Sequence, residues 1–285
     1  MTETPTPEQL ARRAADGDRD AVAALVRALQ NDVYALSLRM LWQPADAEDA
    51  TQEILVRVVT RLGQFDFRSR LKTWVYRIAT NYLLDVKKSC VERQRMSFSS
   101  FAEDLEDGLV AGEPIDPERA LLTEEVKIGC TMGLLQCLDR PHRLAYVLGD
   151  IFEWNAPEAA EALGIEPAAF RKRLQRARQE IEDFTRMRCG LVSETAACAC
   201  HRRVPAALRL GRVEPDKLRF AQSGVTVADA RAFVRQVEET KRVLRLQQSN
   251  HHCGPSRDFA QLIASALDGG AEFVNARETA IFRIL

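Results

Sequence analysis

Apolar residues recur every three or four positions along nearly the whole chain, the spacing that places them on one side of an α-helix. No sustained alternation of apolar and polar residues predicts a sheet. The periodicity is interrupted at Gln43-Pro44, Gly63 and Gly164, where proline or glycine ends or bends a helix. We therefore predict an all-α fold.

The periodicity divides residues 1–96 into three principal helices. The first is long and ends near Trp42, and the second runs from about Asp46 to Leu62. The third runs from about Leu71 to Lys88, after the loop QFDFRSR. We expect these helices to form one domain, residues 1–96.

A strongly acidic stretch follows this domain. The segment SFSSFAEDLEDGLVAGEPIDPE (97–118) contains glycine, proline and seven acidic residues but no basic one. Such a composition is typical of a solvated tether. We predict that residues 97–117 are an acidic linker, that residues 118–188 form a second small helical domain, and that residues 189–285 are a mostly helical extension.

The second domain contains a predicted helix-turn-helix. Asn155 suits an N-cap, Pro157 suits the first turn of a short helix, and Gly164 suits the left-handed turn that ends it. The segment FRKRLQRAR (170–178) then opens a longer helix. Its apolar stripe consists of Phe170, Leu174, Ala177, Ile181 and Phe184. The opposite face is cationic, which favours contact with the major groove of DNA over a merely solvated face.

Composition excludes several classes of protein. The 285 residues carry a net charge of −1, so a uniformly basic nucleic-acid binder is excluded, whereas a segregated basic face is not. No apolar run approaches the ~20 residues that cross a bilayer, and the first residues do not resemble a secretory signal. We expect a cytoplasmic protein with reduced cysteines and no membrane partner. The motifs GxxxxGK[ST], GxGxxG, HExxH and GxSxG are absent, so we expect neither an enzyme nor a cofactor.

Two stretches together resemble a known family. PADAEDATQEILVRVVTRLGQFDFRSRLKTWVYRIATNYLLDVKKS (44–89) is similar to region 2 of bacterial RNA polymerase sigma factors of the extracytoplasmic-function type. LLQCLDRPHRLAYVLGDIFEWNAPEAAEALGIEPAAFRKRLQRARQEI (134–181) resembles their region 4. The resemblance implies a factor that binds core RNA polymerase and directs promoter-specific initiation. It leaves open a separate anti-sigma partner.

The resemblance implies a polymerase-binding surface on the helix from Asp46. An acidic face there would dock on the β′ subunit, although such a face is also typical of a helix that only meets solvent. The residues of this face are Asp46, Asp49, Gln52 and Glu53.

The helix from Leu71 mixes basic and aromatic residues, which suits single-stranded DNA because cations follow phosphates and rings stack on bases. We expect Lys72, Thr73, Tyr76, Arg77, Thr80 and Asn81 to be exposed. Trp74 also suits the core. The resemblance implies that this helix and its loop hold the melted −10 promoter element, through Arg68, Arg70, Lys72, Thr73, Trp74, Tyr76, Arg77 and Asn81.

The predicted helix-turn-helix would bind the −35 element as duplex DNA. The contacts divide between bases and phosphates in a way that the sequence does not assign. The candidate residues are Arg171, Lys172, Arg173, Gln175, Arg176 and Arg178.

The extension lies outside both family regions. Cys189, Cys198, Cys200 and His201 lie close in sequence, and HHC at 251–253 follows. Their spacing is not that of a usual zinc site, so reduced thiols and a metal- or redox-sensing site both stay open and we assign no metal. We predict one helix that is opened near Thr226 and another that follows Pro255-Ser256, and we hypothesise that the extension regulates the factor in cis.

Two other functions compete with a sigma factor. The first is a helix-turn-helix regulator that binds an operator without polymerase. Such a regulator would not need the N-terminal domain. The second is a metal- or thiol-responsive sensing module.

Overall fold

The computed structural model describes residues 5–86, 96–107, 109, 117–218, 242–249 and 254–268. Across these ranges every regular element is a helix and no strand is present, apart from one isolated bridge between Cys189 and Cys198. The predicted all-α fold is confirmed. The HHC segment at 251–253 lies outside the described residues. So does most of the helix predicted to begin near Thr226, of which the structure describes only the end, residues Arg242–Ser249.

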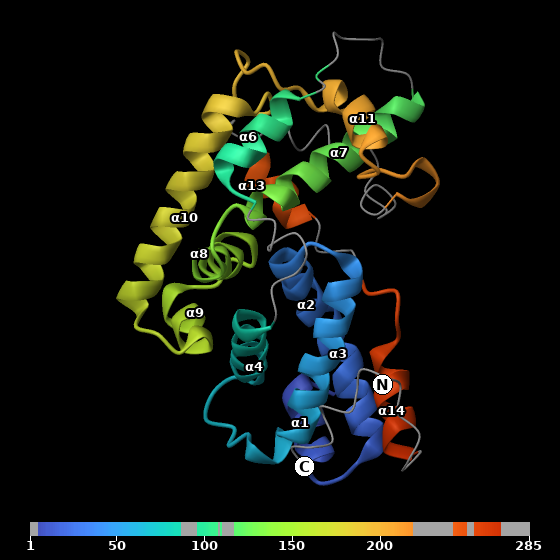
Figure 1. Cartoon of the computed structure of the whole chain (residues 1–285). Helices are drawn as coiled ribbons and strands as arrows, with labels where there is room; N and C mark the ends of the chain where they lie inside the picture. Colours follow the sequence, from blue (N-terminus) through green and yellow to red (C-terminus); the bar gives the residue numbers. More distant parts are fainter. Residues whose placement is uncertain are drawn as a thin grey trace.

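Four helices form the N-terminal unit, residues 5–86 (Figure 1). They pack around fully buried apolar side chains such as Leu25, Ile54 and Leu83. Burial of these side chains supplies most of the stability of such a bundle. The helices are α1 (Pro7–Ala15), α2 (Arg19–Leu41), α3 (Pro44–Thr60) and α4 (Leu71–Asp85).

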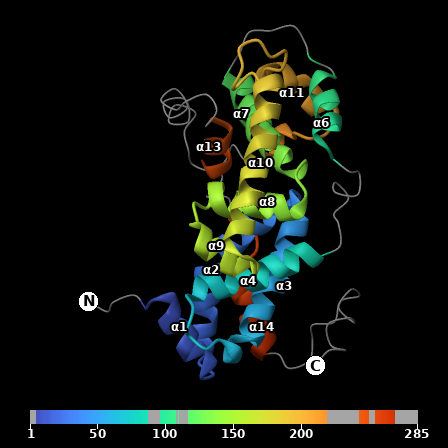
Figure 2. The same ribbon diagram turned by 90° about the vertical axis from the view of Figure 1, so that its left-hand side faces the viewer.

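A second group of helices forms the central unit, described for residues 96–107, 109 and 117–188. Here α10 runs along one side of the central unit, with α9 at one end and α6 towards the other (Figures 1 and 2). The helices are α6 (Phe98–Glu106), α7 (Pro117–Gln136), α8 (Arg140–Tyr146), the π-helical turn η2 (Val147–Ile151), α9 (Ala156–Leu163) and α10 (Pro167–Arg188).

Helix α6 lies inside the segment that we expected to be a solvated tether, and that expectation is wrong for Phe98–Glu106. Phe101 and Leu105 are buried, and the ring centroids of Phe98 and Phe101 lie 5.4 and 5.6 Å from that of Phe184 in α10. The apolar stripe of α6 outweighs the acidic composition because it packs on α10.

The described helices of the extension pack on different parts of the molecule. Helix α11 lies on α7, α13 lies against α7 and η2, and α14 lies on α2 (Figure 1). The extension therefore spans both units. Its helical elements are α11 (Cys200–Arg209), the short 3-10 turn η3 (Pro215–Lys217), α13 (Arg242–Ser249) and α14 (Phe259–Asp268).

The two units are packed against each other, and the sequence had suggested two flexibly linked domains. Helix α4 contacts α9 (Figures 1 and 2). The guanidinium of Arg140 in α8 donates to the carbonyls of Leu84 and Val86 at 2.9 and 2.7 Å. Apolar and hydrogen-bonded contacts thus hold the units in one body.

Candidate polymerase- and DNA-binding surfaces

Helices α9 and α10 form the predicted helix-turn-helix. The side chain of Asn155 accepts a hydrogen bond from the Glu158 amide at 2.9 Å and caps α9. Gly164 ends α9 with φ 62° and ψ 36°, the left-handed conformation in which a Cβ is unfavourable. The predicted apolar stripe of α10 is confirmed: its five residues, from Phe170 to Phe184, are buried.

The opposite face of α10 carries the expected cations. Arg171, Lys172, Gln175, Arg176 and Arg178 are exposed and Arg173 is half-buried. Two of the arginines are already engaged inside the molecule. Arg178 forms a two-pronged ion pair with Asp150 at 2.5–3.1 Å, and this hydrogen bonding raises the pKa of Arg178. Arg176 lies 3.5 Å from Glu180. The N-terminal turns of α10 therefore offer the better candidates for a DNA contact.

The exposure of side chains on α4 agrees with the prediction on one side of the helix and differs on the other. Lys72, Arg77 and Asn81 are exposed as expected. Thr73, Tyr76 and Thr80, which we expected to be exposed, are buried, so that part of the prediction is wrong.

The physical reason is that α9 and the residues before it cover this side of α4. The ring centroid of Tyr76 lies 4.6 Å from that of Trp154 and 6.0 Å from that of Phe152. The hydroxyl of Thr80 donates to the Ala162 carbonyl at 3.1 Å. Burial of this kind raises the pKa of Tyr76 well above its usual range.

The loop before α4 presents Arg68 and Arg70 to the outside. Arg70 lies 2.7 Å from the carboxylate of Glu158 in α9, so this arginine also joins the two units. Trp74 is half-buried, with its ring centroid 5.1 Å from that of Phe65. A role of Trp74 in packing the loop onto α4 fits this contact.

The acidic face of α3 is split in exposure. Asp46 and Asp49 are exposed, whereas Gln52 and Glu53 are half-buried, and Glu53 accepts a hydrogen bond from Arg57 at 2.7 Å. Exposed carboxylates at this end of α3 offer a surface for a basic partner.

The sequence did not indicate that Glu48, which lies beside this face, is buried, or which residues it contacts. Glu48 is buried and accepts hydrogen bonds from the amide and hydroxyl of Ser256 at 2.9 and 2.5 Å. Arg257 lies 3.2 Å from Glu48 and 3.4 Å from Asp49. These partners are 208 residues apart in the chain, so no local pattern signals them.

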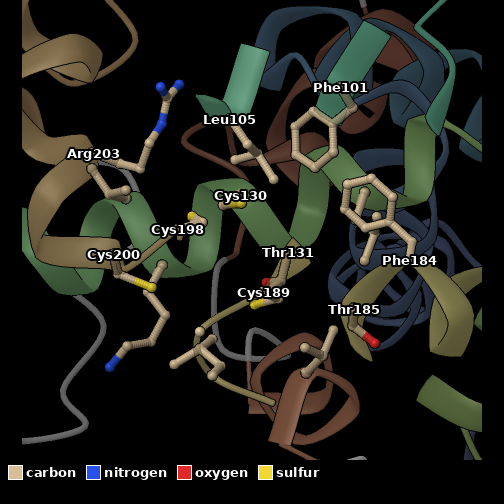
Figure 3. A pocket seen from close by; sticks show the side chains of 16 residues that line it. Phe101, Leu105, Cys130, Thr131, Phe184, Thr185, Cys189, Cys198, Cys200 and Arg203 are labelled. Atoms are coloured by element: carbon tan, nitrogen blue, oxygen red, sulfur yellow. The ribbon is translucent and has the colours of Figure 1, made fainter. Parts of the chain in front are cut away.

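Four cysteines from two segments of the chain line one pocket between α7, α10 and α11 (Figure 3). They are Cys130, Cys189, Cys198 and Cys200. Among the residues that the structure describes, no group of three or more His, Cys, Asp or Glu side chains is arranged to hold a metal ion. Burial raises the pKa of Cys198 to about 11 and that of Cys200 to about 12. Both thiols are protonated at neutral pH, which is unfavourable for metal binding and for reaction with oxidants.

The sequence is similar to those of known proteins. Residues 25–89 match sigma-70 region 2. The chain is 31% identical over 182 residues to the RNA polymerase sigma factor NccH of Alcaligenes xylosoxydans xylosoxydans. This alignment covers 64% of this chain and 95% of NccH. The chain is also 30% identical over 174 residues to the ECF RNA polymerase sigma factor SigW of Bacillus subtilis. That alignment covers 58% of this chain and 89% of SigW.

A solved structure of CnrH in complex with the cytosolic domain of CnrY is similar at 22% identity, with a TM-score of 0.43, over 61% of this chain and 93% of CnrH. None of the helices in the described ranges has the length and apolar character to cross a bilayer.

A helical chain with a region 2 match and a helix-turn-helix is an RNA polymerase sigma factor of the sigma-70 type. The chain belongs to the extracytoplasmic-function (ECF) family of these factors. It binds RNA polymerase and directs promoter-specific initiation of transcription, and sigma factors regulate initiation without catalysing it.

Proposed function

We propose that three surfaces of this chain carry out its work as a sigma factor. The acidic face of α3 (Asp46, Asp49, Gln52 and Glu53) binds the β′ subunit of core polymerase. The exposed face of α10 binds the −35 element as duplex DNA. Helix α4 and the loop before it hold the −10 element as its strands separate. The factor acts in the cytoplasm with polymerase, which supplies the chemistry.

The observation that carries this proposal is the presence of all three surfaces in one chain. Residues 25–89, which match region 2, include both α3 and α4. The cationic face of α10 lies on the second helix of a helix-turn-helix, the helix that enters the major groove in such motifs. A regulator that binds an operator alone would have no use for the surfaces on α3 and α4.

Individual residues take different roles in the −35 contact. Arg171, Lys172 and Gln175 lie in the first turns of α10 and are exposed, so we assign them to the DNA. Arg173 and Arg176 flank this group and are suited to phosphates. Arg178 is paired with the nearly buried Asp150, so we assign it to positioning α10 on the turn before α9.

The residues proposed for the −10 element also differ in access. Four of them are exposed and accessible to single-stranded DNA: Arg68, Lys72, Arg77 and Asn81. Thr73 and Tyr76 are buried, Trp74 is half-buried, and Arg70 is paired with Glu158. Their role requires α9 to move away from α4.

The test is run-off transcription with purified core polymerase, a genomic promoter library and the full-length chain. We expect promoter-dependent initiation above that of core alone. Asp49→Lys should weaken binding to core, and Glu8→Lys, an equal charge change at an exposed site on α1, should not. Arg171→Ala with Lys172→Ala should lower initiation while leaving core binding unchanged. Specific duplex binding without any gain in initiation would support the stand-alone regulator instead.

A further inference from the structure

We propose that the extension is a built-in clamp that holds the free factor closed. Helix α13 ties the N-terminal unit to the central unit, and Arg257, just before α14, pairs with Glu48 and Asp49 at the edge of the α3 face that we assign to polymerase. This inference rests on the roles proposed above for α3 and α4.

Helix α13 joins the units through buried polar contacts. Gln247 is fully buried, and its side-chain amide donates to the Thr131 carbonyl in α7 at 3.0 Å. Its backbone carbonyl accepts from the guanidinium of Arg39 in α2 at 2.8 Å. Arg39 is itself fully buried, so this bond satisfies a charge that water does not reach. One residue of the extension thus bridges both units.

The neighbouring residue extends the contact towards the helix-turn-helix. The side chain of Gln248 donates to the carbonyl of Asp150 at 2.7 Å. Asp150 is the residue that pairs with Arg178 of α10. Val243 and Leu246 of α13 are buried, so apolar packing accompanies these hydrogen bonds.

Helix α14 and the residues before it lie on the N-terminal unit. Phe259 and Ala260 are fully buried, with α14 packed on α2. Ser256 and Arg257 bond to Glu48, and Arg257 also reaches Asp49. A basic side chain of the chain itself is therefore paired with Asp49, on the face assigned to polymerase, and with its neighbour Glu48.

The closed arrangement is incompatible with binding both promoter elements. The −10 and −35 elements are separate stretches of the promoter, and B-form DNA rises about 3.4 Å for each base pair between them. Here α4 and α9 are in contact, with Thr80 bonded to the Ala162 carbonyl. The two units must separate for α4 and α10 to reach their elements together, and α13 opposes that separation.

The extension also holds the start of the acidic linker. Asp104 of α6 accepts two hydrogen bonds from Arg212 at 2.6 Å and one from Arg203 at 3.2 Å. Burial pushes the pKa of Asp104 up, but the hydrogen bonds and charges of the two arginines outweigh it and lower the pKa. Arg209 lies 3.6 Å from Asp107. These contacts lie within the central unit and anchor the first part of the extension there, whereas α13 and α14 reach the N-terminal unit.

Two full-length variants test the clamp. Arg257→Glu places a third negative charge beside Glu48 and Asp49 and leaves the core of the N-terminal unit intact. Arg257→Glu combined with Phe259→Glu also expels α14 from α2. The matched control is Arg202→Glu, the same charge change at an exposed position on α11.

Two measurements report on each variant: affinity for core polymerase, and hydrogen exchange of the amides in α4. A factor that is open only part of the time binds with an affinity reduced by its open fraction. We expect Arg257→Glu to bind core about threefold more tightly, because a surface ion pair contributes little. The double variant should gain roughly tenfold or more, because a buried phenylalanine contributes much more. Exchange in α4 should rise in the same order.

The outcomes separate the clamp from the proposed function. Equal core affinity and equal exchange in the wild type, both variants and the control would overturn the clamp. Faster exchange in the variants without core binding by any of them would support the clamp and overturn the polymerase-binding face. The clamp and the proposed function both hold if exchange and affinity rise together and Asp49→Lys in the double variant abolishes the gain.

Discussion

Replacing Arg143 by methionine should destabilise this protein more than almost any other single substitution of an arginine. The side chain is 2% exposed and lies where two helices end. Its guanidinium donates to the carbonyls of Leu135, Gln136 and Leu138, at 2.9, 3.2 and 2.9 Å, and to the Gln136 side chain at 2.7 Å. It also donates to the carbonyl of Met40.

These acceptors explain why an arginine is buried here. Leu135 and Gln136 are at the C-terminal end of α7, and Met40 is in the last turn of α2, where backbone carbonyls have no partner within the helix. A cation is also favoured at the negative end of a helix dipole. Arg143 thus caps two helices from different units with one side chain.

The magnitude follows from what methionine leaves behind. Methionine fills most of the same volume but donates nothing, and each buried carbonyl without a partner costs ~1–3 kcal/mol. Removal of the arginine also recovers its desolvation cost, and the losses are not additive. We expect the free energy of unfolding to fall by ~3–5 kcal/mol.

The assay is urea unfolding at pH 7, followed by circular dichroism, for Arg143→Met and wild type. Arg171→Met, at an exposed position on α10, is the control and should change stability by less than ~0.5 kcal/mol. A loss below ~1 kcal/mol for Arg143→Met, with unchanged cooperativity, would refute the capping role.

Three further predictions concern single sites. Gly164→Ala should cost ~1–2 kcal/mol of stability in urea unfolding, because alanine is strained at a φ of 62°, whereas alanine at Gly63, where φ is not positive, should cost less. Burial raises the pKa of Cys200 from 9.0 to about 12. The thiol should therefore be alkylated at pH 8 roughly a thousandfold more slowly in the folded protein than in urea, and equal rates would contradict its burial. The stability that the protonated thiol contributes below pH 9 should be lost as the pH rises towards 12. Arg173→Ala should reduce the slope of log affinity against log salt for −35 duplex by about 1, and an unchanged slope would remove its proposed phosphate contact.

The parts of the fold that the sequence predicted are those encoded within one helix. The stripe from Phe170 to Phe184 repeats every three or four residues, so one face of α10 had to be buried whatever it packs against. Asn155 and Gly164 fix the ends of α9 through contacts with residues at most four positions away. In the structure α3 begins at Pro44, two residues before the predicted start at Asp46, because proline is favoured in the first turn of a helix.

The errors came from contacts between distant segments and from composition. Tyr76 has a polar end and an apolar ring, so a helical wheel does not decide whether it is exposed; Trp154 and Phe152 decide it. In α6 the signal was available, because Phe98, Phe101 and Leu105 follow helical spacing. The surrounding acids outweighed that spacing in our prediction of a tether.

The chain has nearly equal numbers of acidic and basic residues, with a net charge of −1, and several of them pair across distant segments. Acidic and basic surfaces of this chain meet each other across the units and the extension, as in Glu158 with Arg70, Asp104 with Arg212, and Glu48 with Arg257. Such pairs are at least partly exposed and contribute only ~0–1 kcal/mol each.

Ion pairs of that strength do not by themselves hold two units together against a partner. The closed arrangement must therefore depend mainly on buried groups of the extension, Gln247 between the units and Phe259 on α2. The ion pairs instead help to fix the orientation in which the surfaces pack, because other orientations would bring like charges together. Raising the salt concentration should thus loosen the closed form only slightly, while it weakens DNA binding steeply.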